Sequence, residues 1–253
     1  MEWTDDAIIL STRKHGEGAV IVDALTRNHG RHAGLVRGGA GKAMRGVLEP
    51  GNEVSLHWVA RLAEHLGNYS VEMIKPRASA LMHDPLLLSG LSSACALVQL
   101  TLPEREPHAT VFEGLRALLD AMQTLELWPA VMVRWELGLL GELGFGLDLG
   151  ACASTGQSDD LMYVSPRSGR AVSRVAGEPY LNRLLALPPF LLGPDNGASV
   201  ADMQAGFELT GFFLSRHVMQ PHGRTMPPAR ERFRDWLQKT ADKSDATDDI
   251  SRA

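Results

Sequence analysis

The chain has 253 residues and a formal net charge of −5. Hydrophobic residues make up 44 % and charged residues 22 %, which are ordinary values for a globular protein and exclude the disordered, collagen-like and coiled-coil classes. The two cysteines exclude a disulfide scaffold, no apolar run approaches the roughly 18 residues of a membrane span, and the first residues lack a signal peptide's basic stretch, so we expect a reduced, cytoplasmic protein.

Five short runs of alternating or β-branched apolar residues, broken by glycine, occupy the first 75 residues. They lie at residues 7–11, 19–25, 32–36, 53–59 and 69–74, and Asn28-His29-Gly30 provides a turn after the second run. Such close spacing is typical of a small antiparallel barrel. Five strands in this length predict an OB-fold barrel domain over residues 1–79.

After residue 79 the apolar residues recur at helical spacing. Helices are predicted from Pro85 onward and over residues 110–125, 128–143, 180–187, 199–218 and 228–239. An irregular insert at 147–178 contains a candidate hairpin, and residues 241–253 have little to bury, which predicts a flexible tail. The expected fold class is therefore α+β, with the barrel followed by an α-helical domain over residues 80–240.

The overall negative charge argues against nucleic-acid binding, but charge is distributed unevenly. Residues 13–45 contain seven basic and two acidic residues, and residues 216–239 contain six basic and two acidic residues. The basic candidates for DNA binding are Arg13, Lys14, Arg27, Arg31, Arg37, Lys42, Arg45, Arg216, Arg224 and Arg230. For each basic cluster the alternative is an ordinary solvated surface.

Aromatic residues on the predicted fourth and fifth strands complete the candidate DNA site. OB barrels bind single strands by combining a positive groove with aromatic side chains on which bases stack. Trp58 and Tyr69 occupy strands where such platforms stand. The alternative for both residues is a place in the barrel core.

The sequence offers no constellation for catalysis. The string Gly39-Ala40-Gly41-Lys42-Ala43 resembles a phosphate loop, but it lacks the earlier glycine and the hydroxyl residue after the lysine. The signatures of α/β-hydrolases, zinc proteases and dinucleotide-binding folds are absent from the sequence. We therefore expect a protein that is not an enzyme and has no catalytic residues.

Several strings resemble, in the expected order, the RecO family of bacterial recombination mediators. Residues 7–13, 16–23, 26–30 and 35–39 resemble the OB domain of that family. Residues 134–144, followed by 147–156, resemble its central helix and zinc-type module, and residues 165–169 and 187–190 match later landmarks. The resemblance covers nearly the whole chain.

The insert at 147–178 departs from the family's zinc-type pattern at its ligands. Structural zinc needs four nitrogen or sulfur ligands. Cys152 is the single thiol among the four expected positions, since Thr155, Ser173 and Ala176 occupy the others. We expect a degenerate zinc-knuckle-like insert in which zinc is absent, and no other cofactor.

The resemblance implies a DNA repair and recombination mediator that binds single- and double-stranded DNA and anneals complementary strands. It also implies association with RecR, a functional link to RecA during the displacement of single-strand binding protein, and a location in the cytoplasm at the nucleoid. The alternative function is a protein-interaction adaptor with an OB barrel that has lost DNA binding.

A partner site is expected on the helical part of the chain. The acidic, apolar tail of single-strand binding protein suits a groove between apolar helices with a guanidinium at its lip. Arg134, which matches the family's Arg-x-Glu-Leu string, is the candidate for that guanidinium. Its alternative role is a salt bridge with Glu136 or Glu142.

Overall fold

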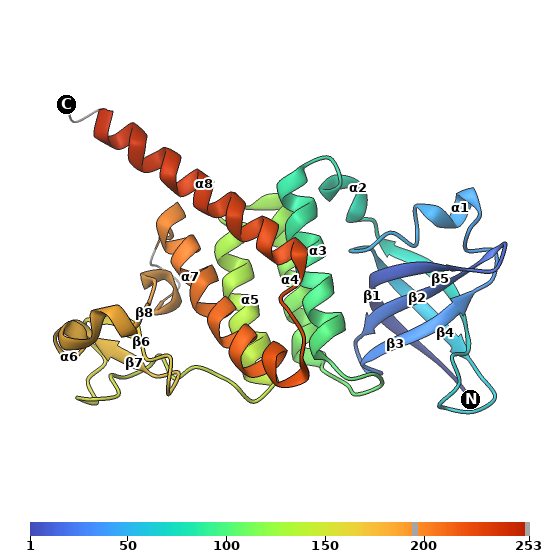
Figure 1. The fold of residues 1–253 in the computed structure, drawn as a ribbon. Coiled ribbons are helices and arrows are strands. Elements are labelled where there is room, and N and C mark those ends of the chain that lie inside the picture. Colours follow the sequence, from blue (N-terminus) through green and yellow to red (C-terminus); the bar gives the residue numbers. More distant parts are fainter. Residues whose placement is uncertain (194–196, 251–253) are drawn as a thin grey trace. The chain divides into compact units, whose positions relative to one another are not determined.

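The computed structural model describes the backbone of residues 1–193 and 197–250, and the side chains of these residues up to Lys239. Packing divides the chain into two compact units, Met1–Leu125 and Glu126–Ala253. The first unit holds a β-barrel with helices packed on it, and the second holds helices and a small sheet (Figure 1). The predicted α+β class, a five-stranded barrel followed by helices, is confirmed.

The barrel closes in the OB strand order, β1-β2-β3-β5-β4. Its strands are β1 (Glu2–His15), β2 (Ala19–Thr26), β3 (Arg31–Val36), β4 (Glu53–Val59) and β5 (Asn68–Lys75). The long strand β1 closes it, because its residues 2–8 pair with β4 and its residues 7–15 pair with β2, with a register shift in the β2 pairing between Ile9 and Ser11. β3 and β5 meet in parallel at one pair, Leu35 and Asn68.

Strand β1 is buried on both faces where its sequence is continuously apolar. Ala7 and Ile9 belong to the core inside the barrel, whereas Ile8 and Leu10 are buried on its outer side. Helices α3 (Pro85–Thr101) and α4 (Ala109–Thr124) contact the outer side of β1 and β2. Two covered faces explain why this strand lacks the alternation of a half-exposed sheet.

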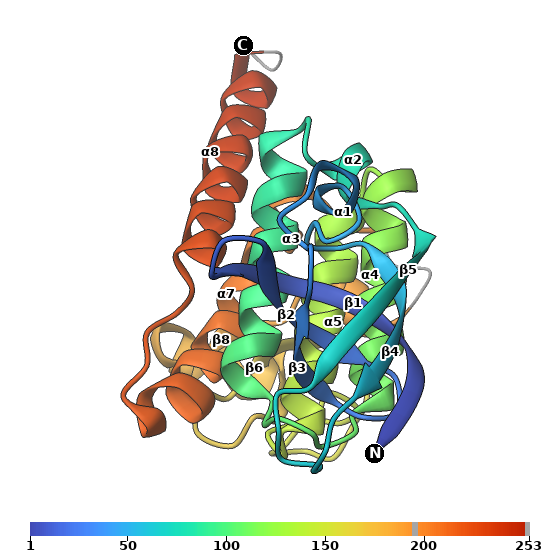
Figure 2. The ribbon, with the colours of Figure 1, turned by 90° about the vertical axis from the view of Figure 1, so that its right-hand side faces the viewer.

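The first compact unit extends beyond the predicted barrel domain of residues 1–79, because α3 and α4 pack on the barrel. Ion pairs join the barrel to α4: Arg77 bonds the buried Glu53 at 2.6 Å and Asp120 at 2.7 Å. Two short helices, α1 (Lys42–Arg45) and α2 (Ala78–Leu81), follow β3 and β5 (Figure 2).

The second unit is built on α5 (Trp128–Glu142), α7 (Val200–Phe213) and α8 (Pro228–Ile250), with a π-helical turn η3 (Leu214–Met219) and a 3-10 turn η4 (Gln220–His222) after α7. Ser199 and Asp202 form a capping box at the start of α7. The backbone of α8 continues into the tail predicted for residues 241–253. Flexibility of that tail stays a prediction, and residues 251–253 lie outside the described part of the chain.

The insert contributes β6 (Leu161–Val164) and β7 (Ala171–Ser173) to a three-stranded sheet whose third strand, β8 (Leu185–Ala186), lies after the insert; the strand order is β7-β6-β8. The short helical turns α6 (Arg174–Gly177) and η1 (Glu178–Arg183) lie between β7 and β8, and η2 (Pro189–Leu191) follows β8. The helix predicted at residues 180–187 is found only in its first part, because residues up to Arg183 belong to the 3-10 turn η1 and Leu185–Ala186 form β8. Pro179 lies in the first turn of η1, where proline is tolerated, whereas the end of this segment pairs with β6 as a strand and Pro188 follows it.

Candidate nucleic-acid interface

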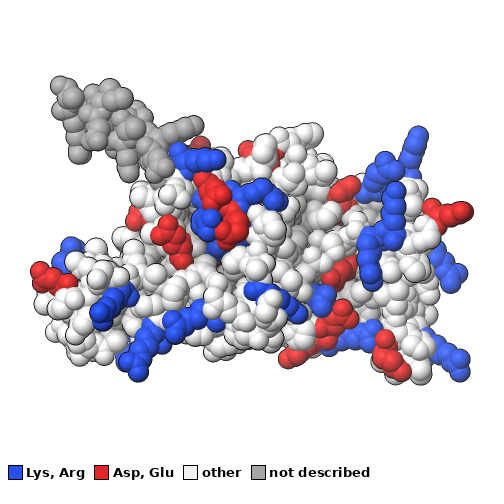
Figure 3. Space-filling model, viewed as in Figure 1, with Lys and Arg blue, Asp and Glu red and all other residues white. Residues whose placement is uncertain are grey.

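Basic side chains gather in the first unit around α1 and the turn between β1 and β2. Figure 3 shows Lys and Arg side chains crowded over these elements, with few acidic ones among them. Among the described residues, the members of this group form no ion pair: Lys14, Arg37, Lys42 and Arg45. We call these four residues the basic rim. All four are exposed, so their charges are available to an anionic partner.

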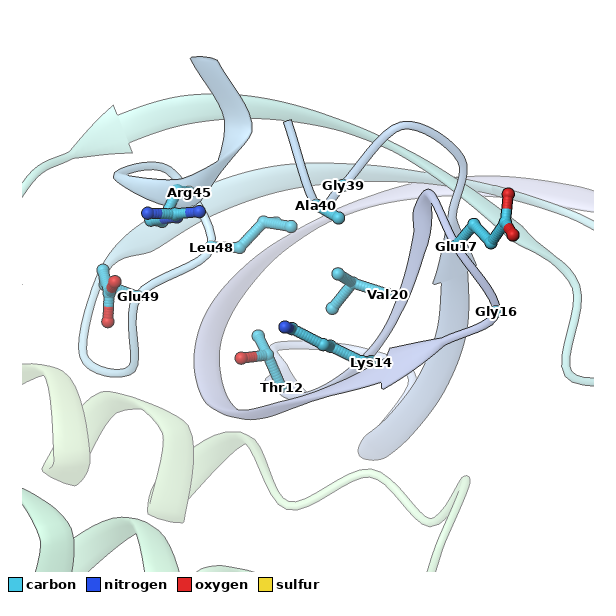
Figure 4. A pocket seen from close by; sticks show the side chains of 10 residues that line it. All are labelled: Thr12, Lys14, Gly16, Glu17, Val20, Gly39, Ala40, Arg45, Leu48 and Glu49. Carbon is cyan, nitrogen blue, oxygen red and sulfur yellow. The ribbon is translucent and has the colours of Figure 1, made fainter. Parts of the chain in front are cut away.

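A hollow of about 610 Å³ lies between the β1–β2 hairpin and the α1 segment. Lys14 and Arg45 line it from opposite sides, and the backbone of Gly39 and Ala40 forms part of its wall (Figure 4). Thr12 and Lys14 share it because alternate residues of a strand face the same way. Two carboxylates, Glu17 and Glu49, also line the hollow and reduce its positive potential.

A second hollow, about 520 Å³, lies on the other side of α1. Arg37 and Met44 line it together with the start of β5. The Nε of Arg37 donates a hydrogen bond to Asn68 Oδ1 at 3.1 Å, which ties this guanidinium to the end of the β4–β5 loop. The basic rim therefore borders two neighbouring concave surfaces of one barrel.

Three of the predicted basic residues of the barrel lie outside the basic rim. Arg13 is exposed but directly precedes Lys14 in β1, so the alternation of side chains along the strand points it to the other face. Arg31 is 16 % exposed and bonds Asp23 at 2.9 Å, Glu104 at 3.4 Å and the Leu102 carbonyl. These acceptors already satisfy the Arg31 guanidinium. Arg31 thereby links strands of the barrel to the loop after α3.

Arg27 is likewise engaged within the first unit. Its Nη2 lies 3.0 Å from Glu113 of α4 and 4.0 Å from Asp6 of β1. The guanidinium also stands over the Phe112 ring at 5.3 Å. Two carboxylates therefore partly neutralise the positive charge of Arg27. Arg27 is for this reason a weaker candidate for binding phosphate than the number of basic residues in this stretch indicates.

The prediction that Trp58 and Tyr69 serve as stacking platforms is wrong. Trp58 is 2 % and Tyr69 is 4 % exposed, and both rings belong to the barrel core. Trp58 Nε1 donates to the Leu66 carbonyl at 3.0 Å, and the Tyr69 hydroxyl is hydrogen-bonded to His32 Nδ1 at 2.9 Å. Both rings pack inside the barrel, so their alternative role in the core is the correct one.

Two rings that the sequence does not mark as a stacking pair, Trp3 and His29, lie beside Trp58. Trp3 stacks on His29 with ring centroids 4.2 Å apart and 9° between the planes. Trp3 also lies 5.6 Å from Trp58, its partner in the β1–β4 register. Strand alternation alone places Trp3 and Trp58 on the same face, but the stacking of a turn residue on Trp3 depends on barrel closure.

Burial changes the titration of two groups in this cluster. It lowers the pKa of His32 to about 4, and the positive charge of Arg105 acts in the same direction. Burial also raises the pKa of the Tyr69 hydroxyl well above its usual value. Both side chains are therefore neutral at pH 7 and add no charge to the surface.

In the second unit, the prediction that Arg230 binds DNA is wrong. Arg230 is 2 % exposed, and its Nε and Nη2 bond the two oxygens of the buried Glu136 at 2.9 Å each. The guanidinium lies over the Phe207 ring at 3.9 Å. Through these contacts Arg230 joins α8 to α5 and α7. Because its side chain is buried, it cannot reach a surface partner.

Arg216 and Arg224 of the same predicted cluster are exposed. Arg216 stands over the Phe212 ring at 5.8 Å. Because Arg230 is buried, the cluster near the C-terminus is less basic at the surface than the sequence indicates. DNA binding by Arg216 and Arg224 stays a prediction.

Arg134 projects from the exposed face of α5. Its Nη2 donates to the carbonyl of Phe190 and, at 3.0 Å, to that of Gly193. Glu136, one of the two salt-bridge partners considered for it, pairs with Arg230 instead. The guanidinium therefore closes the turn after η2, beside the exposed Leu192.

The knuckle-like insert does not present a zinc ligand set. Cys152 is buried, and its Sγ accepts a hydrogen bond from the backbone N–H of Ser173 at 3.3 Å. Burial opposes ionisation of this thiol, but hydrogen bonds from Ser173 and Thr155 outweigh it and lower the pKa of Cys152 to about 6. Ala176 has no donor atom, so these four positions do not fit tetrahedral zinc. Within residues 1–193 and 197–239, no three His, Cys, Asp or Glu side chains cluster as metal ligands.

No helix of the described residues has the length and apolar character that a membrane crossing requires.

Comparison with known proteins gives matches along nearly the whole chain. The family model "Recombination protein O N terminal" matches residues 1–77, and "Recombination protein O C terminal" matches residues 82–226. The DNA repair protein RecO of Rhodospirillum centenum is 56 % identical over 249 residues, which cover 98 % of this chain and 99 % of the relative. The RecO proteins of Rhodospirillum rubrum and Phenylobacterium zucineum are 49 % and 52 % identical, over 94 % and 91 % of this chain and 97 % and 95 % of those relatives.

Proposed function

Because the chain belongs to the RecO family of DNA repair and recombination proteins, we propose that it binds single- and double-stranded DNA at the basic rim of its barrel. The observation that carries this proposal is the group of four exposed cations that lie beside two hollows and form no ion pair with any described residue. Phosphate contacts from Lys and Arg supply most sequence-independent affinity for DNA. The glycine-containing backbone beside Lys14 and Arg45 leaves room for a phosphate to approach.

We propose that the bound strands are annealed to their complements. Two strands approach each other only when the repulsion between their phosphates is reduced, and a cationic surface does this without any catalytic group. This supports a mediator that is not an enzyme. The carboxylates of Glu17 and Glu49 beside Lys14 and Arg45 limit the strength of binding, which suits a protein that must release the duplex it forms.

The partners proposed for this chain follow from its family and from one surface residue. Association with RecR and assistance to RecA on DNA coated by single-strand binding protein rest on family membership. A RecA filament assay with and without the chain and RecR tests them, and no acceleration would count against them. Capture of the acidic tail of single-strand binding protein is assigned to Arg134, because its guanidinium is exposed beside an apolar side chain, Leu192.

Fluorescence anisotropy with a labelled single strand at several salt concentrations tests DNA binding. If each of the four rim cations neutralises one phosphate, the logarithm of the affinity falls with the logarithm of salt concentration with a slope of about −3. The competing function is an adaptor with a barrel that no longer binds DNA, and the ion pairs of Arg27 and Arg31 favour it. Absence of binding at low salt, or binding without a salt slope, would support the adaptor.

A further inference from the structure

Three aromatic rings form a stack at the end of the barrel where β2 turns into β3. Trp58 lies innermost, Trp3 is offset-stacked on it at 5.6 Å and 21°, and His29 stacks on Trp3 at 4.2 Å. Exposure increases along the stack, since Trp58 is buried, Trp3 is half-buried and the His29 side chain is 36 % exposed. The stack therefore ends in an imidazole that faces solvent.

The imidazole of His29 is held in place by Asp5. The Asp5 side chain is buried, and its Oδ2 lies 2.9 Å from His29 Nδ1 and accepts the Asn28 N–H at 2.7 Å. A carboxylate accepts hydrogen bonds, so Nδ1 is the nitrogen that carries hydrogen. Trp3 covers one ring face and Asp5 holds one edge, which leaves the outer face of a fixed ring available.

Two cations of neighbouring loops lie at the same end of the barrel. The loop after α3 packs against the β2–β3 turn: Arg105 N donates to the Arg31 carbonyl at 2.8 Å, and the backbone of Glu106 lies so close to Gly30 that no side chain fits there. The exposed Arg105 guanidinium donates to the carbonyls of Glu64 and His65 in the β4–β5 loop. That loop also carries the exposed Arg61.

The β4–β5 loop connects this end with the basic rim. At the far end of the loop, the Leu35 N–H donates to the Gly67 carbonyl at 3.0 Å, and Arg37 of the rim bonds Asn68. The β4–β5 loop, which carries Arg61 and accepts hydrogen bonds from Arg105, thus links the end of the barrel that holds the stack to the basic rim.

We propose that His29, backed by Trp3, is a stacking platform for a base of single-stranded DNA, an inference that rests on the proposed DNA binding. Every nucleobase has a flat π face, so one fixed ring accepts any of the four bases without sequence preference. A ring already held by Asp5 and Trp3 loses little conformational freedom when the base arrives. This assigns to an exposed turn residue the role that the buried Trp58 and Tyr69 cannot perform.

Two labelled strands of equal length separate base stacking from phosphate binding in the full chain. One is oligothymidine, and the other has the same backbone with abasic sites in place of every base. Wild type binds the thymidine strand more tightly. His29→Ala weakens binding of the thymidine strand by about fivefold or more and leaves the abasic strand unchanged, because the phosphate contacts remain.

Further variants keep the outcome interpretable. His29→Phe retains a flat ring and restores preference for the thymidine strand, whereas His29→Gln keeps a hydrogen-bond donor for Asp5 but has no ring and behaves like His29→Ala. His83→Ala, which removes an exposed imidazole with no ring contact among the described residues, binds both strands like wild type. Circular dichroism confirms that each variant is folded.

The results that overturn the proposal are distinct from those that overturn DNA binding itself. If wild type binds both strands and His29→Ala loses nothing, or loses equally on both, the stacking role is wrong while DNA binding stands. If wild type binds neither strand at low salt, DNA binding fails and the platform fails with it.

Discussion

Arg230 and Lys14 come from similarly basic stretches of sequence and have opposite environments. Arg230 is enclosed by Glu136, Thr210 and the Phe207 ring, so all of its hydrogen bonds are internal. Lys14 stands at the edge of a hollow without an ion pair among the described residues. Removing a partner from a buried pair leaves an unpaired charge, whereas a solvated lysine is free to meet a phosphate.

Arg134→Ala tests the partner site at the level of one side chain. A charge-assisted hydrogen bond to a carboxylate contributes about 1.5–3 kcal/mol, so the substitution weakens binding of a synthetic peptide of the acidic, apolar tail by about tenfold or more. Affinity for single-stranded DNA stays unchanged. Arg183→Ala removes one exposed positive charge elsewhere in the same unit and leaves peptide binding as in wild type. Unchanged peptide affinity in Arg134→Ala would remove this residue from the site.

The buried His32 makes stability depend on pH. Its pKa is about 4 in the folded chain, because burial disfavours the charged ring, and about 6.5 when unfolded. Below pH 6.5 the unfolded chain binds more protons, so the free energy of unfolding decreases as pH falls toward 4, by at most about 1.4 kcal/mol per pH unit. Thermal unfolding of wild type and His32→Gln measures this. The variant shows a shallower loss, and identical pH profiles would contradict the assignment.

Elements formed by local patterns agree with the sequence-based expectations, and elements that depend on distant partners do not. The five strands and the helices α3, α4 and α5 lie where apolar spacing predicts them. The segment at 180–187 differs because β8 forms by pairing with β6, which its own residues do not encode. In the insert, backbone bonds such as Cys152 N–H to the Gln157 carbonyl and Ala153 N–H to the Ala171 carbonyl, each 2.8 Å, hold the loops.

The insert is expected to fold without metal. Elemental analysis of the purified protein should give no stoichiometric zinc, and a chelator should leave the unfolding temperature unchanged, because Cys152 is the single thiol among its four knuckle positions. About one zinc per chain would contradict this expectation and require ligands from outside these positions.

At the scale of the whole molecule, charge counted along the sequence differs from charge at the surface. The fold brings Asp6 and Glu113 to Arg27, and Asp23 and Glu104 to Arg31. Asp6, Glu104 and Glu113 lie outside residues 13–45, so a count over that stretch does not detect their pairing with these two arginines. The same limit explains why the sequence leaves both a surface and a core position open for Trp58 and Tyr69: the closure of β1 on β4 decides which side of each strand lies inside. Family, fold class and the basic rim were predictable, because motif order, apolar spacing and glycine-rich turns are local features.

The central claim is that the basic rim holds DNA by its phosphates. The most direct test is the salt dependence of single-strand binding by Lys14→Ala/Arg45→Ala, compared with Arg167→Ala/Arg183→Ala, which removes two exposed charges from the second unit. The account predicts weaker binding and a salt slope smaller in magnitude by about 1.4 for the first variant, with wild-type values for the second. Equal affinity and slope in wild type and Lys14→Ala/Arg45→Ala would contradict it.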